Sequence, residues 1–180
     1  VREKVGNKLN VPLPPPGEII SQVTNTDLGT VTYTLDNGIK VTVKYTDFKD
    51  NEVLLKGFKY GGYNNYSASD RLDVKYATEL VDAMGIGSYS PSDLEKVLAG
   101  KNVSVSTSIS EIKNSVSGSS TVKDIEVFFQ LLYLTLTSPR LDTGLAATFR
   151  SSQKMMYTFA SASPEFSYLD TTYKVLYNNN

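Results

Sequence analysis

The sequence contains no histidine, no cysteine and no tryptophan among its 180 residues. The absence of histidine excludes Ser-His-Asp and Cys-His catalytic sets and removes the commonest zinc ligand. The absence of cysteine excludes disulfides, thiolate metal sites and cysteine nucleophiles. A metal bound by this chain would have to be held by carboxylates and carbonyls, as calcium and magnesium are. The sequence has neither an EF-hand loop nor a glycine-rich phosphate-binding motif.

The sequence also lacks an excess of either charge and any long hydrophobic run. It has 18 basic and 19 acidic residues, for a net charge of −1. This balance provides no electrostatic attraction for nucleic acid, so we expect no nucleic-acid partner. The densest apolar run, residues 127–136 (VFFQLLYLTL), is too short to span a bilayer, which takes about 20 residues. We therefore expect no membrane insertion, and no signal peptide is recognisable at the start.

The first thirty residues are rich in proline, with prolines at positions 12 and 14–16 followed by Gly17. Proline fixes φ and has no backbone N–H, so this run favours an extended arm over a paired strand. We predict a linker or arm over residues 1–29 and an α+β domain over residues 30–180. Both ends of the sequence have the character of cuts within a longer protein, and we expect the domain to be incomplete at its C-terminus.

The segment after this arm predicts a β-hairpin. Residues 31–35 (VTYTL) and 39–45 (IKVTVKY) alternate β-branched with other residues on either side of Asn37-Gly38. An Asn-Gly pair between two such segments is the strongest short-range hairpin signal. A third strand is expected over residues 52–58 (EVLLKGF).

Helical and strand patterns follow in turn. Apolar residues recur at helical spacing over residues 69–84, and Gly85 ends that helix. Ser92 and Glu95 have the spacing of a capping box, which predicts a shorter second helix. Residues 103–109 and 115–119 are predicted to form a pair of strands.

The most apolar helix is expected to begin after a cap formed by Thr121 and Asp124. Its predicted buried stripe consists of Val122, Ile125, Phe128, Phe129, Leu132, Tyr133 and Leu136. Two further helices are predicted over residues 143–159 and 164–177. This order predicts an α+β fold with an antiparallel or mixed β-sheet and helices packed on one face.

Three segments in this order resemble the repeating domain of the insulinase/pitrilysin-type zinc metallopeptidases: TLDNGIKVTVKYTDFKDNEVLL, SDLEKVLAGKNVSVSTSIS and TVKDIEVFFQLLYLTLTSPRLD. The resemblance covers roughly residues 18–160. It implies an insulinase/pitrilysin (LuxS/metallohydrolase-like) half-domain, from an enzyme whose two related halves close around a chamber. In such an enzyme one half carries the zinc motif H-x-x-E-H on its first helix, and a glutamate of a later helix completes the coordination.

The resemblance places the zinc motif on residues 76–80 (YATEL). Tyr76 and Leu80 stand at the histidine positions, and Glu79 stands at the general-base position. The match of Glu79 also fits an ordinary exposed glutamate beside Lys75. No acidic residue lies between Asp142 and Glu165, where the further ligand is expected. We therefore predict no catalytic residue, no cofactor and no metal in this chain, with zinc in the catalytic half of the parent protein.

The resulting functional hypothesis is a non-catalytic domain of a zinc metallopeptidase. Its partners would be the catalytic half, in the same polypeptide or in a partner subunit, and a peptide substrate held in an extended form. The chain alone should be inactive. The alternative is a degenerate structural or interaction subunit, or a peptide- or glycan-binding module without proteolysis. The bacterial relatives that the chain resembles favour a periplasmic or cell-envelope location.

Three tyrosines flank a glycine- and asparagine-rich loop and are candidates for peptide or interface contact: Tyr60, Tyr63 and Tyr66. They could form an aromatic wall against an unfolded peptide or stack on a sugar. They could equally pack the loop onto the sheet, with their hydroxyls in water.

Overall fold

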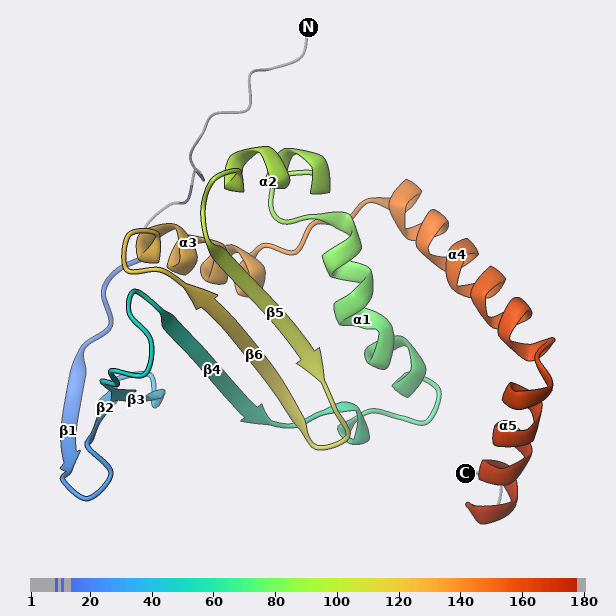
Figure 1. Cartoon of the computed structure of the whole chain (residues 1–180), viewed down its shortest axis with the longest axis horizontal. Coiled ribbons are helices and arrows are strands. Elements are labelled where there is room, and N and C mark those ends of the chain that lie inside the picture. The colour runs from blue at the N-terminus through green and yellow to red at the C-terminus, as the bar shows by residue number, and fades with distance from the viewer. Residues whose placement is uncertain (1–8, 10, 12–13, 178–180) are drawn as a thin grey trace, which may run out of the picture.

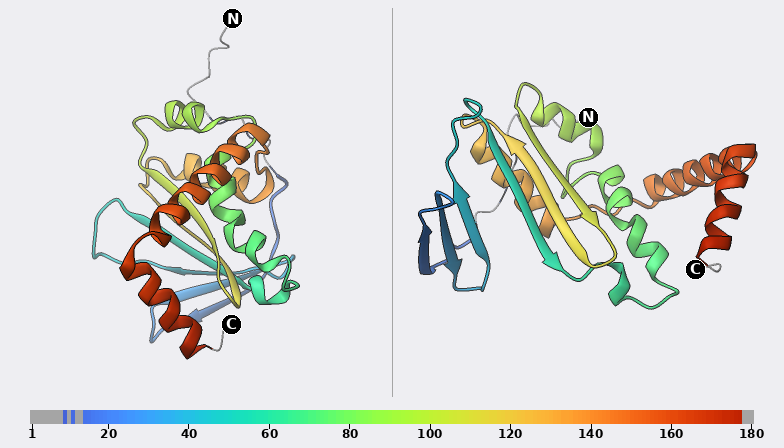
Figure 2. Two further views of the ribbon diagram at one scale, coloured as in Figure 1. Left: turned by 90° about the vertical axis from the view of Figure 1, so that its right-hand side faces the viewer. Right: turned by 60° about the horizontal axis from the view of Figure 1, so that its bottom comes forward.

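The computed structural model describes residues 9, 11 and 14–177, which form two three-stranded antiparallel sheets and five α-helices (Figure 1). The N-terminal sheet has the order β1-β2-β3, and the central sheet has the order β4-β6-β5. Figures 1 and 2 show the N-terminal sheet standing apart at one side, and α3 behind the central sheet. The predicted α+β class with antiparallel sheets is confirmed.

The N-terminal sheet contains the hairpin that the Asn-Gly pair predicts. Its strands are β1 (Ile19–Asn25), β2 (Thr30–Leu35) and β3 (Lys40–Lys44). Gly38 has a φ of 84°, and its N–H donates to the carbonyl of Leu35 at 2.9 Å. This conformation is accessible to glycine and closes the turn between β2 and β3.

Part of the predicted arm is folded. Ile19–Asn25 pairs along β2, although these residues lie within the predicted linker. The prolines end before this segment, so every residue of β1 retains the N–H that a ladder needs. Leu9 is only 5% exposed and belongs to the hydrophobic core. The arm therefore contains a strand and a core residue, whereas the boundary between linker and domain stays a prediction.

The central sheet pairs strands that are distant in sequence. It consists of β4 (Val53–Tyr60), β5 (Val103–Ile109) and β6 (Lys113–Ser120), with β6 in the middle. The strand predicted over residues 52–58 is thus present, but it joins this sheet rather than the hairpin. Between β4 and β5 the chain forms η1 (Tyr63–Asn65), α1 (Arg71–Met84) and α2 (Pro91–Leu98).

Helix α3 (Ile125–Thr137) covers one face of the central sheet. Phe128 is fully buried there, and a Cβ added to Gly118 would lie 2.5 Å from its ring. Val97, Leu131 and Leu134 complete the principal core cluster together with Leu9. The absence of a side chain at position 118 therefore lets the helix approach the sheet closely.

The predicted stripe of α3 is partly wrong. Phe128 is in the core as expected, but Phe129 is 50% exposed and Leu136 is also exposed. The core side instead follows the spacing Phe128, Leu131, Leu134. Since this helix is apolar on nearly all sides, its periodicity does not determine which side faces the sheet.

The N-cap of α2 also lies two residues earlier in the sequence than predicted. Ser90, not Ser92, is the N-cap, and its hydroxyl accepts from the N–H of Asp93 at 3.2 Å. Pro91 occupies the first helical position, where its fixed φ and missing N–H are tolerated. The Ser-Pro pair was therefore a better signal for this helix start than the capping-box spacing.

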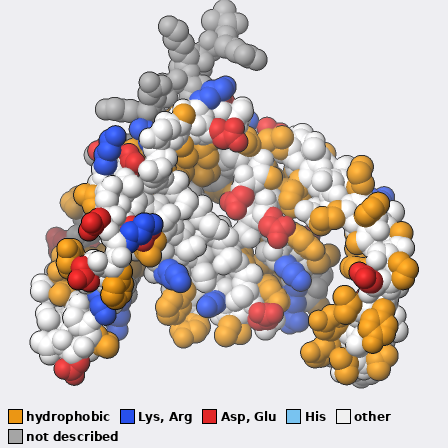
Figure 3. Space-filling model, viewed as in Figure 1, with side chains coloured by type: hydrophobic (Ala, Val, Ile, Leu, Met, Phe, Trp, Pro, Cys, Tyr) orange, Lys and Arg blue, Asp and Glu red, His pale blue; other side chains and the backbone are white. Residues whose placement is uncertain are grey.

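The last two helices extend away from the sheets. They are α4 (Thr143–Ser161), which contacts α1, and α5 (Pro164–Leu176), which contacts α4. Hydrophobic side chains gather on their surface in Figure 3, and Met155, Phe159 and Tyr168 are among the exposed ones. The whole chain exposes 14078 Å², whereas a compact monomer of 19.8 kDa exposes about 8,600 Å².

Among the residues that the structure describes, no helix is long and apolar enough to cross a membrane.

Candidate functional site

Helix α1 carries the residues at which the family resemblance places the zinc motif. It ends at Gly85, which has a φ of 87° and leaves no room for a Cβ because the carbonyl of Tyr89 would be 2.3 Å away. Met84 is buried, and its sulfur accepts from the N–H of Asp142 at 3.2 Å. The end of α1 is thus fixed against the start of α4, and α1 also packs on β5.

Tyr76, Glu79 and Leu80 lie on one side of α1, because residues three and four apart are neighbours on a helix. Tyr76 is 38% exposed, Glu79 is exposed and Leu80 is half-buried. One turn beyond Glu79, burial raises the pKa of the Asp82 carboxyl above its ordinary value. The side chains at the two expected histidine positions are therefore a phenol and an alkyl group.

These residues do not fit a zinc ion. Zinc sites in proteins use three or four nitrogen, sulfur or carboxylate ligands that converge on one point. Within residues 9, 11 and 14–177, no group of three or more histidine, cysteine, aspartate or glutamate residues could hold a metal. The described part of the chain therefore offers no set of ligands for zinc.

The start of α4 shows why Asp142 is not a substitute ligand. Its Oδ1 accepts from the N–H groups of Gly144 and Leu145, at 3.1 and 3.0 Å, and its Oδ2 accepts from Arg140 at 3.1 Å. The bond from Leu145, followed by that from Arg140, lowers the pKa of this carboxyl. Both oxygens are used for capping the helix and for an ion pair, which is a structural role.

The tyrosine loop follows β4 and lies against the turn between β5 and β6. The N–H of Tyr63 donates to the carbonyl of Ser110 at 2.9 Å, and that of Gly61 donates to Ile112 at 2.9 Å. Gly62 has a φ of 77°, and a Cβ there would lie 2.4 Å from the Ser110 carbonyl oxygen. This loop is therefore held in one conformation by backbone contacts that only glycine permits.

The three tyrosines have different environments. Tyr60 is 75% exposed and packs edge-on against Phe58 with a centroid distance of 5.6 Å. Tyr63 is half-buried, and its hydrogen bond with Glu111 raises the pKa of the tyrosine and lowers that of the glutamate. Tyr66 is exposed. Tyr63 thus anchors the loop, while Tyr60 and Tyr66 leave aromatic surface free for contact.

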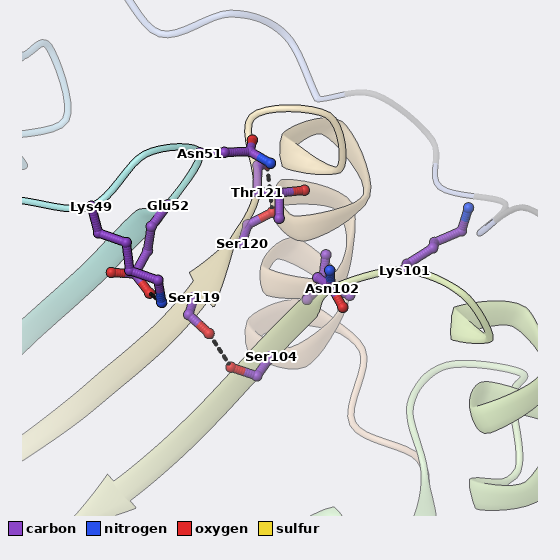
Figure 4. A pocket seen from close by; sticks show the side chains of 10 residues that line it. Lys49, Asn51, Glu52, Lys101, Asn102, Ser104, Ser119, Ser120 and Thr121 are labelled. Atoms are coloured by element: carbon purple, nitrogen blue, oxygen red, sulfur yellow. Dashed lines mark hydrogen bonds and ion pairs between the residues drawn. The ribbon is translucent and has the colours of Figure 1, made fainter.

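A polar pocket lies at the opposite end of the central sheet from this loop. Its volume is about 500 Å³, and it lies where β4 and β5 begin and β6 ends (Figure 4). Lys49 forms an ion pair with Glu52 at its rim, and the hydroxyls of Ser104 and Ser119 are 2.9 Å apart. The residue spacing in the sequence did not indicate this pocket, because its lining comes from three separate segments that only the fold brings together.

Comparison with known proteins identifies relatives among zinc proteases. No family model matches the sequence. A zinc protease PQQL-like protein of Arabidopsis thaliana is 37% identical over 86 residues, which cover 48% of this chain and 9% of that protein. The probable zinc protease PqqL of Haemophilus influenzae is 29% identical over 114 residues, or 63% of this chain and 12% of that protein.

Two solved structures share the fold over almost the whole chain. The ferredoxin protease FusC, in complex with Arabidopsis ferredoxin, has a TM-score of 0.81 at 18% identity and covers 97% of this chain and 19% of its own. The periplasmic protease PqqL from Escherichia coli has a TM-score of 0.77 at 20% identity, over 96% of this chain and 19% of its own. This chain therefore spans a small part of the length of the proteins that it matches.

The fold is that of an insulinase/pitrilysin-type half-domain, which confirms the resemblance. Over part of its length the chain is related in sequence to zinc proteases of the PqqL type.

Proposed function

We propose that this chain is a non-catalytic domain of a zinc metallopeptidase. It would help to enclose the chamber and hold an extended peptide, which the partner half hydrolyses. The proposal rests on α1: the helix is present within the shared fold, but Tyr76 and Leu80 stand where the resemblance places the histidines of the zinc motif. A fold without its metal ligands can still contribute surface and position to a shared chamber.

The exposed surface supports a covering partner. The surface that the chain exposes in excess of a compact monomer is about 5,000 Å², whereas one partner of a standard protein–protein interface buries about 800 Å². Exposed apolar residues on α4 and α5 include Leu169, Tyr173 and Leu176. Because the excess surface is large and partly apolar, it favours a permanent interface with the catalytic half and the rest of the parent protein. A transient encounter would not need so much apolar surface.

The relatives support a polypeptide substrate and a location outside the bacterial cytoplasm. FusC is described as a ferredoxin protease, and PqqL of Escherichia coli as a periplasmic protease. We extend both properties to the parent of this chain: it would cleave a polypeptide, and it would do so in the periplasm or cell envelope.

Peptidase assays with and without this chain test the proposed role. The catalytic half of the parent protein is assayed on a quenched fluorescent extended peptide, first alone and then with the chain added. We expect the KM for the peptide to fall and kcat/KM to rise, because the chamber wall is then complete. The chain alone should not cleave the peptide. Association of the two halves without any change in the kinetics would instead favour a purely structural subunit.

A further inference from the structure

The central sheet has a second face, opposite α3, which no element of the described structure covers. Strand alternation places one residue in two on this open face, in rows that run across β4, β6 and β5. The register sets Leu54, Ser119 and Ser104 in one row. The next rows are Lys56, Ser117 and Ser106, then Phe58, Ser115 and Ser108, and then Tyr60 with Lys113.

The composition of the open face differs from that of a buried face. The side toward α3 carries Val53, Leu55, Val105 and Gly118, which are apolar or small. The open face has serine at six positions on β5 and β6. A face built to pack against another layer of the fold carries apolar residues, since burying hydroxyls without partners costs free energy. The serine rows therefore suit a solvated, polar ligand, and their small size lets an extended backbone lie close.

The charges on the open face have one sign. Lys56 and Lys113 point to this side, and neither forms an ion pair among the described residues. No aspartate or glutamate occupies the four rows. Helix α1, which carries several carboxylates, contacts β5, the edge strand opposite β4. Positive charge is thus concentrated over β4 and the start of β6.

The polar pocket continues this face at its other end. Ser104 and Ser119 belong to both the first row and the pocket lining. Lys49 and Lys101 also line the pocket (Figure 4); Lys49 pairs with Glu52, and the Asp124 carboxylate lies near Lys101. A ligand that extends along β4 would therefore meet Lys113 at one end, Lys56 further along and Lys49 at the pocket end.

We infer that the open face of the central sheet binds acidic, extended segments of polypeptide. Carboxylates of the segment pair with Lys56, Lys113 and the pocket lysines, the serine hydroxyls donate to its carbonyls, and Phe58 and Tyr60 contact its apolar side chains. This inference rests on the proposed function, for which it names the class of substrate: unfolded segments rich in aspartate and glutamate.

The test compares two labelled, unstructured peptides of equal length and apolar content, one rich in glutamate and one rich in glutamine. Their binding to the intact 180-residue chain is measured by fluorescence anisotropy at low and physiological ionic strength. We expect the acidic peptide to bind more tightly, with the difference shrinking as salt rises. The double variant Lys56→Glu/Lys113→Glu should weaken its binding by about tenfold or more.

The matched control is Lys40→Glu/Lys44→Glu, which makes the same charge change on exposed residues of the N-terminal sheet. It should leave the binding of the acidic peptide within about twofold. Equal loss in both double variants, equal affinity for the two peptides, or tighter binding of an oligothymidylate of equal charge would overturn the inference. Equal affinity for the two peptides would still leave the chamber-wall role intact, whereas failure to bind either peptide would count against both proposals.

Discussion

Phe128 and Phe129 are adjacent in α3 but have opposite environments. Phe128 has no exposed surface, and its ring lies against Gly118 of β6. Phe129 is half exposed and touches Phe128 edge-on at a centroid distance of 5.3 Å. The two positions therefore form a matched pair, in which the same side chain is a core residue at one position and a surface residue at the other.

Replacing these phenylalanines tests the packing directly. Phe128→Ala should lower the free energy of unfolding by about 3–5 kcal/mol, because it removes a buried ring and leaves a cavity. Phe129→Ala should lower it by about 1 kcal/mol or less. Urea denaturation followed by circular dichroism measures both. Equal losses in the two variants would contradict the orientation of α3 on the sheet.

Gly118 provides a second test at the scale of the residue. Gly118→Ala adds a methyl group that would lie 2.5 Å from both the Phe128 ring and the carbonyl oxygen of Ser104. We expect a loss of about 1–3 kcal/mol from overpacking. Gly17→Ala is the control, since the added Cβ would meet its nearest atom at 3.6 Å. A thermal melt that is unchanged in Gly118→Ala would show that the helix and sheet are not in close contact.

At the scale of the element, the secondary structure was largely predictable from local patterns. The Asn-Gly hairpin, α1 and the pair β5 and β6 follow signals that involve only neighbouring residues. The strand Ile19–Asn25 was missed because the prolines before it dominated the pattern. The placement of β4 beside β6 was not predictable, since that pairing joins segments about sixty residues apart and depends on the global fold.

The features of the candidate site also fall into two groups, those that the sequence alone predicts and those that only the fold reveals. The absence of histidine is visible in the sequence, and the fixed spacing of the zinc motif led to the prediction that Tyr76 and Leu80 stand at its histidine positions. The open face and the pocket were not predictable from the sequence, because Lys49, Ser104 and Ser119 come together only when β4, β5 and β6 are assembled. A local motif can thus indicate in the sequence that zinc ligands are missing, whereas a binding surface can be recognised only once the strands of the sheet are placed side by side.

The junction before α4 predicts a pH dependence of stability. The folded-state pKa of Asp142 is lowered by the N–H of Leu145 and by Arg140. Its contribution is therefore present above the pKa of the unfolded chain, and it is lost as the pH falls through the lower folded-state pKa. Asp142→Asn keeps an acceptor for the helix N–H groups but removes this titration.

We expect the urea midpoint of Asp142→Asn to fall less between neutral and acidic pH than that of the unmodified chain. Leu141→Ala, at an exposed neighbouring position, should keep the original pH dependence. An Asp142→Asn variant with the same slope as the unmodified chain would show that this carboxylate does not stabilise the start of α4.

At the scale of the whole molecule, the chain exposes more surface than its mass requires. Its solvent-accessible surface of 14078 Å² includes apolar side chains on α4, α5 and the N-terminal sheet. These elements project from the central sheet on either side (Figure 2). We expect the isolated chain to bind a hydrophobic dye such as ANS and to self-associate in sedimentation experiments. Addition of the catalytic half should reduce both signals, and an unchanged dye signal in a demonstrated complex would place the interface elsewhere.

The loss of the zinc centre is the central claim, and metal analysis of the purified chain tests it most directly. The chain is equilibrated with zinc, desalted and measured by inductively coupled plasma mass spectrometry, with the catalytic half as a positive control. We predict far less than one zinc per chain and no peptide cleavage by the chain alone. One tightly held zinc ion per chain, lost on treatment with a chelator, would contradict the account.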